Sequence, residues 1–282
     1  MTEHALLFPC GQDTLVGILS LPAVPTHTGV VIVVGGPQYR VGSHRQFVLL
    51  ARVLAAAGYP VLRFDYQGMG DSNGPVADFL TASPSIRAAM DSLQSHVPKV
   101  EKIVLWGLCD AASAALLYLH ETHDDRVAGL CLLNPWVRSE TSLARTQVKH
   151  YYIQRLMQRE FWTKLLSGKV ALGALKGLAQ NIRLSRSKVV TISSDTRPFQ
   201  QRMSTSWINF DGRILLLLSG NDYTAKEFLD YATEDASWCR AFSHLHLERH
   251  DLPHADHTFS NPTAQMQVEK LTLHWIQAGH PH

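Results

Sequence analysis

Short apolar runs alternate with amphipathic stretches along most of the chain. Strands buried on both faces carry continuous aliphatic runs, whereas a helix on the surface of a sheet is apolar on one side only. The apolar runs predict strands at residues 29–35, 60–64, 101–106, 127–133 and 213–219. The stretches that follow predict helices near residues 45–57, 84–96, 110–121, 224–238 and 263–277. Strands that alternate with helices favour a parallel sheet with helices on both faces.

Two further patterns complete this sheet. Residues 3–9 and 14–21 alternate apolar and polar positions and predict an antiparallel hairpin at a sheet edge. Residues 242–248 predict the last strand. The predicted fold class is therefore α/β, with a doubly wound and mostly parallel sheet.

The alternation stops between residues 138 and 210. Residues 140–184 are helix-like, with apolar positions interleaved with basic ones. The segment 138–210 holds 13 Lys or Arg residues against three acidic ones, a net charge of +10 in a chain whose total is +2. A charge asymmetry of this size favours a separate inserted subdomain. We therefore expect a core made of residues 1–137 and 211–282, and a basic helical insertion at 138–210.

Composition limits the class of protein. The chain has 282 residues, 45% hydrophobic, and no apolar run near the roughly 18 residues of a membrane span. The first residues, Met1 to His4, show no signal peptide. The four cysteines are scattered without a Cys-x-x-Cys pair, which indicates neither disulfides nor zinc and fits a reducing cytosol. We expect a cytoplasmic protein; its oligomeric state is not predicted.

The sharpest local signal is the turn Gly107-Leu108-Cys109-Asp110-Ala111, between a strand and an alanine-rich helix. Small residues stand two positions on either side of Cys109, as a tight turn with a strained apex residue requires. The pattern matches the Gly-x-Ser-x-Gly nucleophile elbow, with Cys for Ser and Ala for the second Gly. The alternative is a buried cysteine in an ordinary strand-to-helix connection.

A nucleophilic cysteine needs a base and a group that orients it. Functional residues gather at the carboxyl ends of parallel strands. Asp222 follows one predicted strand and lies 113 residues after Cys109. His257 follows the next and lies 35 residues after Asp222. His257 would accept the thiol proton, and Asp222 would fix the imidazole tautomer.

Other interpretations of these residues remain open. Asp222 can be a helix N-cap, with Asn221 or Thr224 as competitors for that place, and His257 can be one surface histidine of a His-rich chain. Asp195 and Asp211 are rival acids, less favoured because neither directly follows a strong strand.

An oxyanion hole needs two backbone N–H donors. Asp110, directly after the nucleophile, would supply one. The Gly35-Gly36-Pro37-Gln38 loop would supply the other, from Gly36 or Gln38, because Pro37 has no N–H. We favour Gly36, since a glycine lets the backbone approach a substrate closely.

Together these motifs resemble the α/β-hydrolase fold over nearly the whole chain. The order nucleophile, acid, histidine is the order of that superfamily. The strings around Gly35–Arg45 and Gly107–Ala112 resemble, more narrowly, the exosortase A system-associated hydrolases of bacterial exopolysaccharide loci. The resemblance implies an ester or thioester hydrolase with a Cys109–His257–Asp222 triad. Cysteine in place of serine is similar to the dienelactone hydrolases and implies a thioester intermediate.

The resemblance also places a helical cap at residues 138–210. Its basic residues either form a solvated face or present a positive rim that favours anionic acyl substrates. Acyl transfer to a saccharide, or a non-catalytic scaffold of the exopolysaccharide machinery, are the alternative functions. We interpret the loop Asp65–Ser72 as structural, with direct substrate contact as the alternative.

No cofactor or metal is expected. Five histidines, at 244, 246, 250, 254 and 257, raise the question of a metal site, but no carboxylate or cysteine completes a set with known ligand spacing. Nothing apart from the charge of the insertion suggests nucleic-acid binding, and the expected partner is a small acyl substrate.

Overall fold

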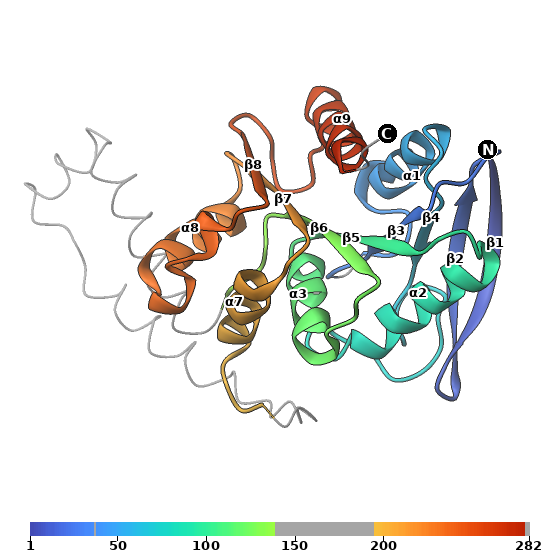
Figure 1. The fold of residues 1–282 in the computed structure, drawn as a ribbon, viewed down its shortest axis with the longest axis horizontal. Helices are drawn as coiled ribbons and strands as arrows, with labels where there is room; N and C mark the ends of the chain where they lie inside the picture. The colour runs from blue at the N-terminus through green and yellow to red at the C-terminus, as the bar shows by residue number, and fades with distance from the viewer. Residues whose placement is uncertain (37, 139–194, 280–282) are drawn as a thin grey trace, which may run out of the picture. The chain divides into compact units, whose positions relative to one another are not determined.

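The fold is seen in a computed structural model that describes residues 1–36, 38–138 and 195–279. One eight-stranded sheet runs through these residues in the order β1-β2-β4-β3-β5-β6-β7-β8 (Figure 1). Its strands are β1 (Thr2–Cys10), β2 (Asp13–Leu21), β3 (Thr28–Val33), β4 (Val61–Phe64), β5 (Lys102–Leu108), β6 (Val127–Leu133), β7 (Arg213–Ser219) and β8 (Leu247–Leu252).

The sheet is antiparallel only at its N-terminal edge. β1 pairs with β2 and β2 pairs with β4 in antiparallel register, and every other pair is parallel. All residues of β3 and β4 are buried, as are most residues of β5, β6 and β7. This is why their sequences are continuous apolar runs.

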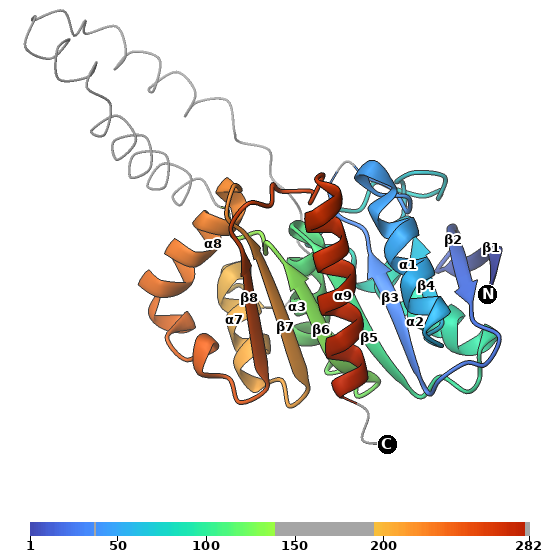
Figure 2. The same cartoon turned by 90° about the horizontal axis from the view of Figure 1, so that it is seen from above.

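Helices cover both faces of the sheet (Figures 1 and 2). α1 and α9 lie on one face, and α2, α3 and α7 lie on the other. The described helices are α1 (Gln46–Ala56), α2 (Ser83–His96), α3 (Asp110–Thr122), α7 (Phe199–Asn209), α8 (Tyr223–Glu234) and α9 (Pro262–Ala278). Each face has its own apolar core, and the predicted α/β class with a doubly wound, mostly parallel sheet is confirmed.

The last strand lies later than the sequence predicted. Residues 242–248 were expected to form it, but Ala241–Ser243 is a short 3-10 turn and β8 spans Leu247–Leu252. The alternation that suggested a strand does not reflect burial, because Leu245 is 93% exposed. β8 is a charged edge strand, and charges on an edge oppose pairing with a second chain.

The insertion lies mostly outside the described residues. By its contacts the chain divides into one unit of Met1–Arg138 with Arg197–His282, and a second unit of Ser139–Thr196. The helix α7, which we had included in the insertion at 138–210, packs against α3 of the core. The predicted helices at 140–184 fall on residues that are not described, and the cap stays a prediction.

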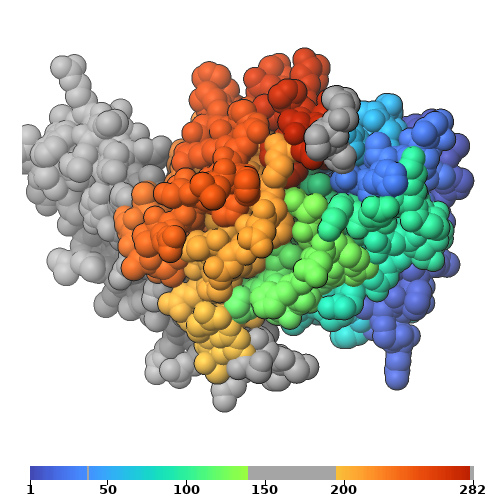
Figure 3. Space-filling view, in the orientation of Figure 1, coloured from blue at the N-terminus to red at the C-terminus, as the bar shows by residue number. Residues whose placement is uncertain are grey.

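The space-filling view shows α2, α3 and α7 side by side across one surface of the core unit (Figure 3). Among the described residues, each helix is too short or too polar to cross a lipid bilayer.

Candidate active site

Cys109 lies at the apex of a sharp turn between β5 and α3. Its backbone has φ 63° and ψ −125°, a conformation that non-glycine residues rarely adopt. The turn is held from both sides: Cys109 N–H donates to Leu133 O at 2.8 Å, and Cys109 O accepts from Ala112 N–H at 3.1 Å. Such strain persists only where the surrounding structure enforces it, and it clusters at functional sites.

The small residues around Cys109 are required by close backbone contacts. A Cβ on Gly107 would lie 2.6 Å from the carbonyl group of Ala111. A Cβ on Gly35 would lie 2.7 Å from the backbone nitrogen of Ala111, so the loop after β3 also passes close to the elbow. Ala111 itself is fully buried. The elbow predicted from the sequence is thus explained by packing that leaves no room for side chains at Gly107 and Gly35.

His257 and Asp222 are brought together at the carboxyl ends of β8 and β7. His257 Nδ1 lies 2.8 Å from Asp222 Oδ2, so Nδ1–H donates to a carboxylate that is only 7% exposed. Hydrogen bonds with Asp222 first and with Cys109 next raise the pKa of His257 to about 10, against a smaller opposing effect of burial. His257 thus bonds Asp222 directly, and the raised pKa of His257 shows that the Cys109 side chain interacts with the same imidazole.

Asp222 also caps α8, so the two interpretations of this residue hold together. Its Oδ1 accepts from Thr224 N–H at 3.1 Å, and its Oδ2 accepts from Ala225 N–H at 3.2 Å. The rival acid Asp211 precedes β7 and so lies at the opposite end of that strand from Asp222.

Three residues that the sequence did not single out hold the His257 loop in place. Asn134 Nδ2 donates to Ser219 Oγ at 2.9 Å and, more weakly, to His257 O at 3.4 Å. Ser219 Oγ donates to Asp256 O at 2.9 Å. A Cβ on Gly220 would lie 2.3 Å from Pro253 O, so the loops after β7 and β8 are in direct contact. The sequence did carry a signal for two of them, because Asn134 and Ser219 are polar residues at the ends of the apolar runs of β6 and β7.

The expected oxyanion donors have partners within the protein. Gly36 N–H donates to Asp110 Oδ2 at 2.8 Å. Gln38 N–H makes a long turn hydrogen bond of 3.4 Å to Gly35 O, and the Gln38 side chain accepts from Ser43 N–H. The side chain of Asp110, which we had considered only for its backbone, thus lies against the predicted oxyanion site.

The loop Asp65–Ser72 is an anchor for the loop after β3. Asp65 is buried and accepts from the backbone N–H of Arg40 at 2.7 Å, and it forms an ion pair with the guanidinium of Arg40. Asp71 N–H donates to the same carboxylate at 3.1 Å, and Ser72 Oγ donates to Asp65 O at 2.9 Å. These bonds support our structural interpretation of the loop.

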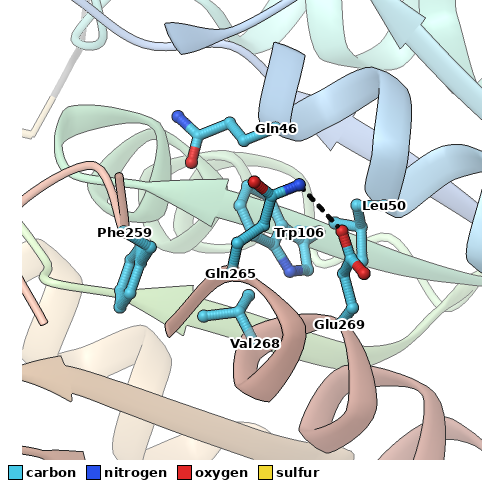
Figure 4. A pocket seen from close by; sticks show the side chains of 7 residues that line it. All are labelled: Gln46, Leu50, Trp106, Phe259, Gln265, Val268 and Glu269. Atoms are coloured by element: carbon cyan, nitrogen blue, oxygen red, sulfur yellow. Dashed lines mark hydrogen bonds between the residues drawn. The ribbon is translucent and has the colours of Figure 1, made fainter. Parts of the chain in front are cut away.

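Metal-ligating side chains do not cluster in the described part of the chain. No group of three or more His, Cys, Asp or Glu in it could hold a metal ion. His244 Nε2 instead bonds Phe210 O, and His250 pairs with Glu248. A small pocket lies between α1 and α9, where Gln265 bonds Glu269, but Cys109, Asp222 and His257 do not line it (Figure 4).

Three of the 13 basic residues of the predicted insertion are described, and all three have polar partners in the core unit. Arg138 pairs with the buried Glu227 at 2.8 Å, Arg202 is itself buried and pairs with Glu121, and Arg197 bonds Thr205. These three do not form a free positive rim. The other ten lie outside the described residues.

The model of the Hydrolase_4 family, described as serine aminopeptidase, S33, matches residues 25–209. The chain belongs to this α/β-hydrolase family. The matched part includes Gly36, Cys109 and Asp110 and ends before Asp222 and His257. The family description names a serine enzyme, whereas this member has Cys109 at the elbow. No curated protein matches the sequence.

Solved structures of other α/β-hydrolases share the fold of this family member. The Pyrococcus furiosus esterase Pf2001 is 14% identical with a TM-score of 0.65, over 99% of this chain and 94% of that one. A carboxyl esterase from Bacillus coagulans is 16% identical with a TM-score of 0.64, over 99% of both chains. The α/β-hydrolase GrgF from Penicillium sp. sh18 is 16% identical with a TM-score of 0.66, over 99% of both chains.

Proposed function

We propose that this member of the family hydrolyses a carboxylic ester or thioester through an acyl–Cys109 intermediate. Cys109 is the nucleophile, His257 transfers the protons, and Asp222 orients His257. The observation that carries the proposal is the hydrogen bond between His257 and Asp222, with the Cys109 side chain acting on the same imidazole from a strained elbow. The esterases among the structural neighbours favour the same class of substrate.

The hydrogen bond between His257 and Asp222 determines which imidazole nitrogen transfers protons. Because His257 Nδ1 is bound to Asp222, Nε2 is the atom that takes the proton of the Cys109 thiol. The sulfur attacks the acyl carbon, the C–O or C–S bond of the substrate breaks, and the leaving group takes the proton from Nε2. Water then gives a proton to Nε2 and attacks the thioester, which releases the acid and returns the thiol.

Electrostatics favour an activated sulfur. With a pKa of about 10, His257 is an imidazolium at pH 7, so Nε2 already holds the proton that it takes from Cys109 in the resting enzyme. An imidazolium beside a thiol, together with the N-terminus of a helix such as α3, stabilises the thiolate. A thiolate is the reactive form of a cysteine nucleophile.

The identity of the acyl group remains a prediction. The basic charge of residues 138–210 favours an anionic substrate. The resemblance of the loop and elbow strings favours a place in exosortase-associated exopolysaccharide loci, where a saccharide could replace water as the acceptor of the acyl group.

Burst kinetics test the proposal. Short-chain p-nitrophenyl esters and acyl thioesters are mixed with native protein, and the adduct is measured by intact mass. We expect one acyl group per chain, which Cys109→Ala abolishes and the matched control Cys239→Ala, at an exposed cysteine, retains. An adduct that persists in Cys109→Ala, or a folded native protein with neither adduct nor turnover on any of these substrates, would contradict it.

A further inference from the structure

The residue after the proposed nucleophile carries an acidic side chain that is mostly buried. Asp110 is the first residue of α3, and its Oδ1 is buried without a hydrogen-bond partner among the described residues. The carboxyl group lies tightly against the loop after β3, because a Cβ on Gly35 would be 2.0 Å from Oδ1. A polar group left in this condition is uncommon in proteins and calls for an explanation.

The carboxyl group accepts hydrogen bonds where an oxyanion would. Gly36 N–H donates to Oδ2 at 2.8 Å, and the backbone N–H groups of Ala111 and Asp110 also stabilise the charged carboxyl. Gly36 and Asp110 are the two backbone donors that we assign to the oxyanion hole. The Asp110 carboxyl group therefore accepts the Gly36 N–H that we assign to the oxyanion hole.

A second buried polar group lies within electrostatic range of this carboxyl. The Tyr66 hydroxyl is buried and has no hydrogen-bond partner among the described residues. Burial, followed by the charge of Asp110, raises the pKa of Tyr66. The two buried groups therefore interact through charge.

The Asp110 carboxyl group is also poorly stabilised as an anion. Burial raises its pKa, against the lowering effects of the Gly36 and Ala111 N–H groups and of the charge of His257. A raised pKa means that the neutral form of the carboxyl group, which is the weaker acceptor for Gly36 N–H, is more accessible here than for an exposed aspartate.

We propose that the Asp110 carboxyl group occupies the oxyanion hole of the resting enzyme and is displaced from Gly36 N–H by the carbonyl oxygen of the substrate. This rests on the proposed function, since it concerns the acylation of Cys109. Asp110 is then a specificity-determining residue: only an acyl group bound well enough by the rest of the site displaces it. Poorly bound esters react slowly because the Gly36 donor is occupied.

Two substitutions separate this role from a purely structural one. In Asp110→Ala the Gly36 donor is free, so we expect acylation of Cys109 by a short p-nitrophenyl ester to accelerate about tenfold or more. One oxyanion donor is worth about 10² to 10³ in rate, which sets the upper limit. Asp110→Asn keeps a neutral acceptor of the same shape, so its rate should fall between those of the native protein and Asp110→Ala. If the carboxyl group only anchors the loop, Asp110→Ala slows acylation and Asp110→Asn retains the native rate, which would overturn the proposal.

A measurement without substrate keeps this test apart from the proposed function. With ¹⁵N-glycine labelling, the Gly36 amide can be identified by its loss in Gly36→Asn, a residue that tolerates the positive φ at this open position. We expect Asp110→Ala to shift this amide upfield and to accelerate its hydrogen exchange. An unchanged Gly36 amide would overturn the inference even if Cys109 is acylated. A shifted amide in a protein that forms no acyl adduct would support the contact while the proposed function fails.

Discussion

Asp222 performs two tasks that one pair of substitutions can separate. Its carboxylate caps α8 through the N–H groups of Thr224 and Ala225, and it accepts a hydrogen bond from His257 Nδ1. Asn is as good an N-cap as Asp but carries no charge. Ala can neither cap the helix nor accept the hydrogen bond from His257. Asp222→Asn should therefore remove the effect on His257 alone, and Asp222→Ala should remove both.

The expected changes in unfolding free energy can be worked out from the structure. Loss of the cap in Asp222→Ala should cost about 0.5–2 kcal/mol of unfolding free energy relative to Asp222→Asn. A rise in the pKa of His257 from 6.5 to about 10 corresponds to at most about 5 kcal/mol. Since 34% of the His257 side chain is exposed, screening by water reduces this to about 1–3 kcal/mol.

The sign of the pH dependence follows from the direction of the shift. His257 binds its proton more tightly in the folded than in the unfolded protein, so its contribution is fully present below about pH 6.5. The contribution is lost as the pH rises towards 10. In Asp222→Asn, where the largest cause of the raised pKa is gone, this loss should be smaller and should end at a lower pH.

Urea unfolding at pH 6, 8 and 10 measures the effects of both substitutions on the free energy of unfolding. The turnover of a p-nitrophenyl ester measures their effect on catalysis. We expect kcat to fall about 10²- to 10⁴-fold in Asp222→Asn, because the amide holds the wrong imidazole tautomer. Two results would refute the reasoning: equal pH dependence of stability in the native protein and Asp222→Asn, or equal stability of Asp222→Asn and Asp222→Ala.

Further predictions concern the elbow and two partly buried carboxyl groups. Gly107→Ala should cost about 1–3 kcal/mol and abolish the acyl adduct, because the added Cβ meets the Ala111 backbone; Ala111→Gly should keep the adduct. Asp110→Asn should become more stable relative to the native protein as the pH rises above about 3.8, since burial raises the pKa of Asp110. Asp124→Asn should be less stable than native protein above about pH 3.8, and the difference should shrink steadily as the pH falls from there to 3, because Arg126 lowers the pKa of Asp124. Urea titrations from pH 3 to pH 8 measure both carboxyl effects.

How well the sequence predicted each strand depended on how deeply the strand is buried. β6 and β7 begin and end at the predicted residues, because burial on both faces leaves an apolar run that needs no periodicity to detect. β8 was misplaced because an edge strand with polar partners carries little apolar signal. The alternating residues just before it, including the exposed Leu245, imitated a strand.

In the candidate site, too, some features could be predicted from the sequence and others could not. Cys109, Asp222 and His257 could be proposed from the sequence because chain order and strand ends are properties of the sequence, and in the structure His257 bonds Asp222 and interacts with Cys109. The Gly36–Asp110 hydrogen bond could not be found, since it depends on the rotamer of one side chain and on how closely the loop after β3 approaches α3. The acid directly after the cysteine was visible, but nothing in the sequence said which donor it would bind.

The two carboxyl groups of the site act on the same imidazole in different ways. Asp222 bonds His257 directly, whereas Asp110 is linked to it only through charge: the charge of His257 lowers the pKa of Asp110. Coupling between two titrating groups is reciprocal, so an ionised Asp110 must raise the pKa of His257 in turn. Asp110→Asn should therefore lower the pKa of His257, but less than Asp222→Asn does. In the proposed reaction His257 gives its proton to the leaving group, and Asp110 then loses that stabilising charge. The carboxyl group that competes for Gly36 N–H is thus held most firmly as an anion in the resting ion pair, and the charge that holds it is removed during turnover.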